Sequence, residues 1–174
     1  RFAQELGLVL GLLALVFWLA ALLSYTLNDV AWSTTGALGT NAATVVARNW
    51  GGRFGAWLAD GSYFLLGFSV WWTLAVGVRA WLVFLTRWLR GEPLSDINAT
   101  ASDRVKFWVC FALLLLASSA LEWSRLYRFE SVLPGHAGGV LGYLAGPASV
   151  KYLGFTGSGL VWIALGVISV SMVF

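Results

Sequence analysis

Residues 6–25 read LGLVLGLLALVFWLAALLSY and contain no charged side chain. A helix of 20 apolar residues rises about 30 Å, which matches the hydrocarbon thickness of a bilayer. A cleaved secretory signal has a shorter apolar core, of about 7–15 residues, behind a basic start. We therefore interpret this stretch as a retained membrane-spanning helix.

The composition of the whole chain agrees with a membrane location. Of the 174 residues, 59% are hydrophobic and 11% are charged, whereas soluble domains have about 45–50% apolar and about 25% charged residues. A chain this short could not bury so much apolar surface in water. The 11 Trp, 5 Tyr and 11 Phe are typical of helices whose ends meet lipid headgroups. The composition predicts an all-α membrane protein.

Three more apolar stretches are long enough to cross a membrane. The four expected spans cover about 6–25, 54–78, 105–123 and 153–174. The third lies between Lys106 and Glu122, and the fourth is still apolar where the given chain stops. We therefore expect these residues to be part of a longer polypeptide.

Residues 132–146 are apolar but, as a helix of about 22 Å, too short to cross. Pro134 opens this stretch and Pro147 closes it. Gly138, Gly142 and Gly146 recur every fourth residue and share one helical face, a pattern of small residues that favours close helix packing. Before the last span we expect a short Gly-rich helix, either interfacial or re-entrant.

The basic residues predict the topology. Residues 79–106 hold 5 of the 11 Lys and Arg, and Arg79, Arg87 and Arg90 lie on one side of an amphipathic extension of the second span. By the positive-inside rule, the loop 79–104 is cytoplasmic. The loops 26–53 and 124–152 are then periplasmic, and both termini are cytoplasmic.

The residue inventory excludes several kinds of chemistry. One cysteine, Cys110, and one histidine, His136, cannot supply the four ligands of a structural zinc site. A G-x-x-x-x-G-K-[ST] loop for nucleotide phosphates is absent, because Val105 and Val150 precede the two lysines. We expect no catalytic residue, cofactor or metal in this segment.

Asp60 is a carboxylate within the second expected span, among the small residues Gly55, Ala56, Ala59 and Gly61. Carboxylates inside spans are often proton or ion sites. We favour a structural role at a helix end, since we find no second acidic residue deep in another span. Gly51 and Gly55 form a further small-xxx-small pattern.

Three motifs resemble the membrane domain of the FtsK/SpoIIIE family of bacterial DNA translocases, in particular its proteobacterial members. NWGGRFGAWLADGSYFLLGFSVWW at 49–72 is similar to the second-span signature of that family. SYTLNDVAWS at 24–33 resembles the segment after its first span, with Val30 in place of the usual proline, and LPGHAGGVLG at 133–142 resembles the segment before its last span.

The resemblance implies a membrane anchor and assembly domain at the division septum of the inner membrane. It implies homo-oligomers, hexameric by analogy with the family, and contacts with septal division proteins. The ATP- and Mg-dependent motor that moves DNA would lie C-terminal to residue 174. We expect packing or partner contacts from Trp32, Gly52, Gly55, Trp57, Asp60, Pro134, Gly138 and Gly139.

Two alternatives remain open at this point. The first is a small transporter or channel subunit that uses Asp60 as its ion site. The second is an intramembrane hydrolase built around His136 and Ser158.

Overall fold

The computed structural model describes residues 2–33, 47–91 and 101–174. These residues form helices, 3₁₀ turns and loops, with no strand among them. Four helical stretches are long and apolar enough to cross a membrane: Phe2–Leu23, Gly52–Arg90, Ala101–Arg125 and Gly139–Val173. The expected all-α membrane fold is confirmed. Residues 34–46 of the expected loop 26–53 and residues 92–100 of the expected loop 79–104 lie outside the described residues.

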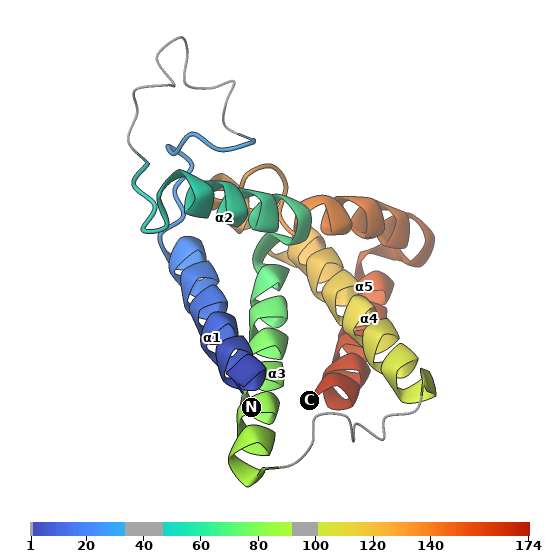
Figure 1. The fold of residues 1–174 in the computed structure, drawn as a ribbon. Coiled ribbons are helices and arrows are strands. Elements are labelled where there is room, and N and C mark those ends of the chain that lie inside the picture. The colour runs from blue at the N-terminus through green and yellow to red at the C-terminus, as the bar shows by residue number, and fades with distance from the viewer. Residues whose placement is uncertain (1, 34–46, 92–100) are drawn as a thin grey trace.

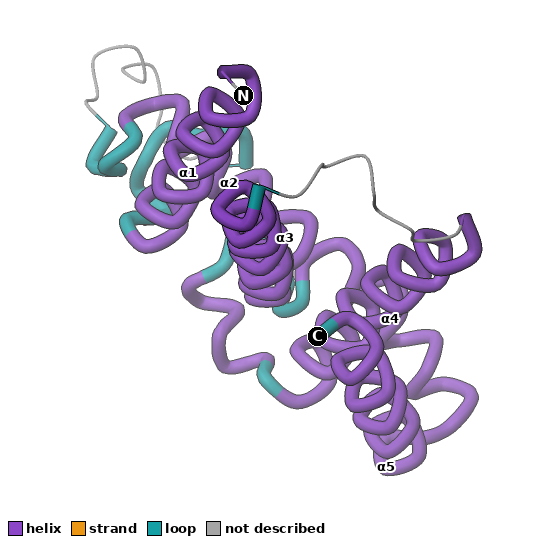
Figure 2. The backbone as a smooth tube through the Cα atoms, turned by 60° about the horizontal axis from the view of Figure 1, so that its bottom comes forward, coloured by secondary structure: helices purple, strands orange, loops and turns teal. Residues whose placement is uncertain are grey.

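Helix α1 (Phe2–Leu23) lies beside α3 (Val70–Arg90), as two views show (Figures 1 and 2). The Trp81 indole Nε1 donates a hydrogen bond of 2.9 Å to the Leu8 carbonyl. A Cβ added at Gly77 would lie 3.0 Å from Leu15 Cδ2. Small residues let the two backbones approach closely, as in other membrane helix pairs.

Helix α2 (Gly52–Leu66) lies across the end of α1 instead of continuing the direction of α3 (Figure 1). Its buried face consists mainly of the small residues Gly55, Ala56 and Ala59. The 3₁₀ turn η2 (Gly67–Ser69) then redirects the chain into α3. The residues of the second expected span, 54–78, therefore belong to two helices that meet at a corner.

Gly67 forms this corner because no other residue fits there. Its φ is 59°, a conformation that disfavours residues with a Cβ. An added Cβ would also lie 2.6 Å from the Glu122 carboxylate and 2.7 Å from the Gly138 Cα. The positive φ and the close approach of two other segments both require glycine.

Helices α4 (Ala101–Arg125) and α5 (Gly139–Val173) form an antiparallel hairpin through the 3₁₀ turn η3 (Tyr127–Val132). A Cβ at Gly142 would lie 2.5 Å from the Ser119 carbonyl, and one at Gly146 would meet the Trp123 ring. The expected glycine face thus packs on α4.

Helix α5 bends at Gly154, where the backbone is not helical. Its first half lies across the same end of the molecule as α2, and its second half runs back beside α4 (Figures 1 and 2). Arg125 holds the bend, because its Nη2 donates to the Phe155 carbonyl at 2.7 Å and its guanidinium lies 3.6 Å over the Phe155 ring.

The short helix expected over 132–146 begins later, at Gly139, and does not end at Pro147. A proline inside a helix removes one N–H donor and leaves the carbonyl four residues earlier without its bond. That carbonyl belongs to Tyr143, and both Tyr143 and Pro147 are exposed. We attribute the continuation through Pro147 to this exposed position.

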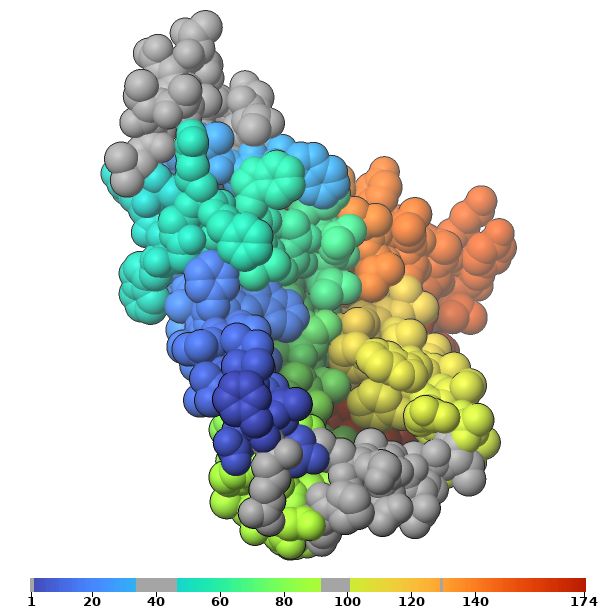
Figure 3. Space-filling view, viewed as in Figure 1, coloured from blue at the N-terminus to red at the C-terminus, as the bar shows by residue number. Residues whose placement is uncertain are grey.

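The structure consists of two helix pairs joined at a corner. Figure 2 shows α1 beside α3 and α4 beside α5, and the α2–α3 corner contacts both α4 and α5. In the space-filling view, α2 covers the upper end of α1 (Figure 3). The N and C ends lie at the opposite end of the molecule, close to the same level (Figure 1).

We predict that Gly138→Ala destabilises the fold more than Gly91→Ala does. Both glycines have a left-handed backbone conformation, with φ of 75° at Gly138 and 69° at Gly91. An added Cβ at Gly138 would press on the Ser119 carbonyl, whereas one at Gly91 would meet nothing within 4 Å. Overpacking adds about 1–3 kcal/mol to the backbone penalty. Thermal unfolding of the protein in lipid vesicles measures the difference, and equal losses in the two variants would contradict the packing at Gly138.

Candidate functional site

Two carboxylates on helices are almost fully buried at the end of the molecule where α2 lies. Asp60 on α2 is 0% exposed and Glu122 on α4 is 5% exposed. Buried carboxylates require hydrogen-bond donors to offset the loss of water. Among the described residues, no group of three or more His, Cys, Asp and Glu side chains is placed to hold a metal ion.

The Asp60 cluster consists of Asp60, Tyr25 and Ser33. Asp60 Oδ1 accepts hydrogen bonds from the Tyr25 hydroxyl at 3.2 Å and from the Ser33 hydroxyl at 2.5 Å, and Oδ2 accepts one from the Ser33 backbone N–H at 2.8 Å. Both donors lie in the segment after α1. The carboxylate therefore fastens this segment to α2.

The phenol of Tyr25 stays protonated in this cluster. Burial and the neighbouring Asp60 carboxylate raise its pKa above the ordinary value of a tyrosine. Because the neutral phenol is the hydrogen-bond donor, the contact with Asp60 persists across the physiological pH range.

A second set of polar contacts completes the end of α1. Asp29 accepts hydrogen bonds from the backbone N–H groups of Arg48 at 2.7 Å and Asn49 at 3.0 Å. The Asn49 amide donates to the Ala21 carbonyl at 2.8 Å and accepts from the Gly51 N–H at 2.9 Å. The last carbonyls of a helix have no intrahelical partner, so the Asn49 amide takes the place of water at the Ala21 carbonyl, and Asp29 holds the backbone of Arg48 and Asn49 in position.

The Glu122 cluster consists of Glu122, Ser69, Ser118 and the backbone of Phe68. Glu122 Oε2 accepts from the Phe68 N–H at 2.8 Å, and Oε1 accepts from the Ser69 hydroxyl at 2.5 Å. The Ser69 and Ser118 hydroxyl oxygens lie 2.8 Å apart, and the Trp72 indole donates to Ser118 at 3.2 Å. These contacts tie the α2–α3 corner to α4.

Glu122 marks the end of the third expected span, and its burial was not expected: it is 5% exposed, three residues before the end of α4. The sequence signal was available. Ser118 and Ser119 stand one turn before Glu122 in an otherwise apolar run, and adjacent hydroxyls mark a helix face that is able to make polar contacts. What the sequence did not indicate was the partner, a turn more than 50 residues earlier.

The predicted residues on and before α2 have different surroundings. Trp32 is 54% exposed and meets Phe64 edge-to-face, with ring centroids 5.4 Å apart. Gly52 begins α2, and an added Cβ there meets nothing within 4 Å. Gly55 is buried against Asn49 and Ala21. Trp57 is 55% exposed.

The predicted residues before α5 lie at the junction of the two helix pairs. Pro134 is buried. Gly138 contacts the Ser119 carbonyl, and an added Cβ at Gly139 would lie 2.6 Å from the Leu65 carbonyl carbon. The structure thus brings Gly138 and Gly139 together with Gly67 at the α2–α3 corner.

His136 and Ser158 have separate partners. His136 Nδ1 lies 2.6 Å from Glu130, and its ring stacks on Tyr143 with centroids 4.7 Å apart. Ser158 donates to the Phe155 carbonyl of its own helix at 3.0 Å. A hydroxyl that donates within its own helix is typical of a structural serine in a membrane helix, so these contacts do not support the hydrolase alternative.

Comparison with known proteins finds relatives that match all or most of this chain. Residues 1–174 match the family described as the 4TM region of DNA translocase FtsK/SpoIIIE. DNA translocase FtsK 2 of Ralstonia nicotianae is 36% identical over 100% of this chain and 22% of its own length. DNA translocase FtsK 1 of Neisseria meningitidis serogroup A is 30% identical over 94% of this chain and 19% of its own length.

A third relative, DNA translocase FtsK of Pseudomonas syringae pv. syringae, is 36% identical over 86% of this chain and 17% of its own length. This chain therefore spans about a fifth of the length of the curated relatives it matches. No solved structure matches the chain.

We predict that Asp60→Asn releases the segment after α1. The carboxylate charge strengthens the hydrogen bonds that Asp60 accepts, and a neutral amide with one acceptor oxygen holds Tyr25 and Ser33 less tightly, by about 1–3 kcal/mol. Hydrogen exchange of residues 25–33 measures the release. Asp103→Asn, at a side chain 53% exposed, is the control and should leave that exchange unchanged. Unaltered protection of residues 25–33 in Asp60→Asn would refute this role.

We predict that Glu122→Ala loosens the α2–α3 corner. The Phe68 N–H loses its acceptor in a buried place, which costs about 1–3 kcal/mol, whereas the Ser69 hydroxyl can still donate to Ser118. Faster hydrogen exchange at the Phe68 amide reports the change. Glu130→Ala, at a 45% exposed side chain, should not affect that amide, and equal effects of the two variants would count against the cluster.

Proposed function

Because this chain belongs to the family of four-transmembrane regions of FtsK/SpoIIIE DNA translocases, we propose that it anchors such a translocase at the division septum. The family match over the whole chain carries this proposal. In this role the segment holds the translocase in the inner membrane while the cell divides, and so couples chromosome segregation to division.

The structure supports an anchoring role through its surface. Large apolar side chains are exposed along each of the membrane-length helices, for example Leu13 (59%), Leu82 (47%), Val109 (51%) and Val167 (65%). Exposed apolar area on this scale is unfavourable in water and favourable against lipid. Asp60 and Glu122, both buried, hold segments of the chain to one another.

The motor is proposed to lie C-terminal to residue 174, in the part of the relatives that this chain does not cover. ATP, Mg and DNA are then partners of that part, and this segment holds the motor at the membrane. We also propose that both termini of the segment are cytoplasmic. Their placement at one end of the molecule supports this topology (Figure 1).

Self-assembly is a further element of the proposal, with a hexamer as the state that the family resemblance favours. The glycine faces expected to mediate helix packing are occupied within the chain: Gly55 packs on α1, and Gly142 and Gly146 pack on α4. Contacts between copies would therefore use other faces, among them the exposed apolar sides of α1 and of the second half of α5.

The alternative of an ion site at Asp60 has no specific observation in its favour. Asp60 is 0% exposed and accepts three hydrogen bonds from Tyr25 and Ser33. A transport site has to exchange such partners for an ion or a proton. The geometry around Asp60 supports a fixed structural contact.

The proposal predicts that residues 1–174 direct the protein to the septum. A fluorescent fusion of the intact protein in dividing cells should be several-fold enriched at midcell, because the segment contacts division proteins there. A matched fusion, in which an unrelated four-helix anchor replaces this segment, should spread evenly along the membrane. Equal midcell enrichment of both fusions would overturn a targeting role for the segment and leave only the anchor.

A further inference from the structure

Helix α2 carries an apolar face that is largely exposed, apart from the contact of Phe54 with Phe17 of α1. Phe54, Trp57 and Leu65 are 72%, 55% and 50% exposed on it. At 100° per residue these three side chains, with Leu58 and Gly61, fall within about 100° of arc. We call these five residues the outer face of α2.

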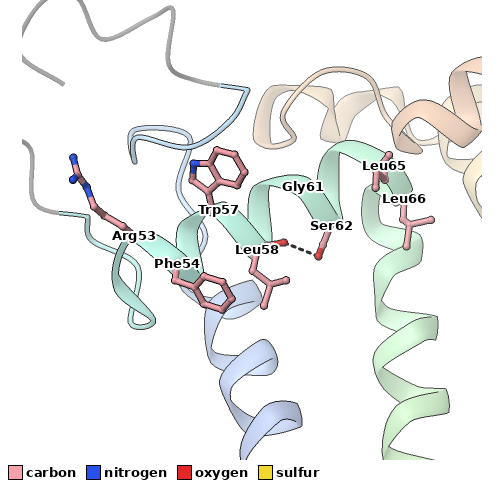
Figure 4. A pocket seen from close by; sticks show the side chains of 8 residues that line it. All are labelled: Arg53, Phe54, Trp57, Leu58, Gly61, Ser62, Leu65 and Leu66. Atoms are coloured by element: carbon pink, nitrogen blue, oxygen red, sulfur yellow. Dashed lines mark hydrogen bonds between the residues drawn. The ribbon is translucent and has the colours of Figure 1, made fainter. Parts of the chain in front are cut away.

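The outer face borders an apolar groove of about 620 Å³. Gly61 lies at its centre, where an added Cβ would meet nothing within 4 Å. Figure 4 shows Phe54 and Leu58 on the side of α2 toward the body of α1, and Arg53 and Trp57 on the opposite side. Across the width of the helix, the side chains that line the groove therefore change from purely apolar ones to an indole and a guanidinium.

The opposite face of α2 packs against the rest of the chain. Ala56, Ala59 and Asp60 are 0–1% exposed there, and the Trp18 indole donates to Ser62 at its edge at 3.2 Å. The contacts with α1 and with the segment after it therefore fix the rotation of α2. The outer face cannot turn inward without breaking the Asp60 cluster.

The length and direction of α2 indicate that it does not cross the membrane. Its 15 residues rise about 22 Å, too little to cross the hydrocarbon core, and the helix runs across the ends of α1 and α3 (Figure 1). Helix α3 alone has 21 residues, about 31 Å, which suffices for a crossing. The stretch Gly52–Arg90 therefore needs only α3 to pass through the membrane.

The outer face continues the exposed surface of α1. Phe54 and Phe17 lie with ring centroids 5.8 Å apart, and the neighbouring α1 side chains Leu13 and Val16 are 59% and 53% exposed. A lipid-facing helix thus adjoins the groove directly.

We propose that α2 lies flat at the membrane surface and that its outer face binds phospholipid. Acyl chains fill the groove against Phe54, Leu58 and Leu65, while Trp57 and Arg53 lie at headgroup level. Indole rings and basic side chains are favoured at that depth. The protein then crosses the membrane with α1, α3, α4 and the second half of α5, and α2 is an interfacial helix.

Nitroxide labels, attached one per chain at the positions of two matched pairs, test this orientation in the intact protein. The native cysteines, Cys110 among them, are replaced by serine. Phe54→Cys and Leu65→Cys are 11 residues apart on one face of α2. Val78→Cys and Leu89→Cys have the same spacing on α3, at positions 40% and 66% exposed. Oxygen and nickel-chelate accessibility in vesicles of phosphatidylethanolamine and phosphatidylglycerol gives the depth of each label.

The two labels on α2 should differ in depth by less than about one helical turn, or about 5 Å. The two labels on α3 should differ by about 16 Å, which is the rise of 11 residues. A depth difference near 16 Å on α2 would overturn the proposal, because α2 would then cross the membrane.

Occupation of the face by a second copy of the chain is also distinguishable. Labels at 54 and 65 would then be shielded from both reagents and show spin–spin broadening, which would overturn lipid as the occupant. If Phe54→Cys fails to fold, Leu58→Cys with Leu65→Cys replaces the pair. Leu82→Cys with Leu89→Cys, also seven residues apart, is then the control, and the expected difference is less than about 5 Å on α2 against about 10 Å on α3.

Discussion

A backbone turn that lies near the hydrocarbon of a membrane has to satisfy its polar groups without bulk water. Within lipid an unpaired N–H or carbonyl costs several kcal/mol, so a chain that bends near the hydrocarbon needs partners at each bend. The α2–α3 corner depends on this constraint most. Glu122 accepts hydrogen bonds from the Phe68 N–H and the Ser69 hydroxyl, and Gly67 and Gly138 let the segments approach closely enough for those bonds to form.

The same solution recurs at the other bends. Asn49, Ser24 and Tyr63 satisfy the last carbonyls of α1, and Arg125 binds the Phe155 carbonyl beside the bend of α5. Asn49, Tyr63 and Arg125 come from other segments of the chain, whereas Ser24 directly follows α1. These polar side chains therefore determine which segments are held together, while apolar contacts and glycine faces determine how closely the helices pack.

The sequence was sufficient for the features that depend on local composition. The uncharged run at 6–25 became α1, and the spacing of Gly138, Gly142 and Gly146 correctly indicated a helix packed on a neighbour. The corner at Gly67 was not predictable in this way. The residues on both sides of it are apolar and favour helix equally, and the group that stabilises the bend is Glu122, 55 residues later. Long-range hydrogen bonds of this kind leave no periodic signal, so the stretch 54–78 looked like one helix.

Helix α2 and the first half of α5 also affect the shape of the protein within a lipid bilayer. Both α2 and the first half of α5 lie at the end opposite the termini (Figure 1), so the protein is wider at that level than at the level of the termini. A tapered inclusion displaces more area in one leaflet than in the other. Such an imbalance acts as spontaneous curvature, and the energy of the protein in the bilayer then depends on how strongly the surrounding membrane is bent.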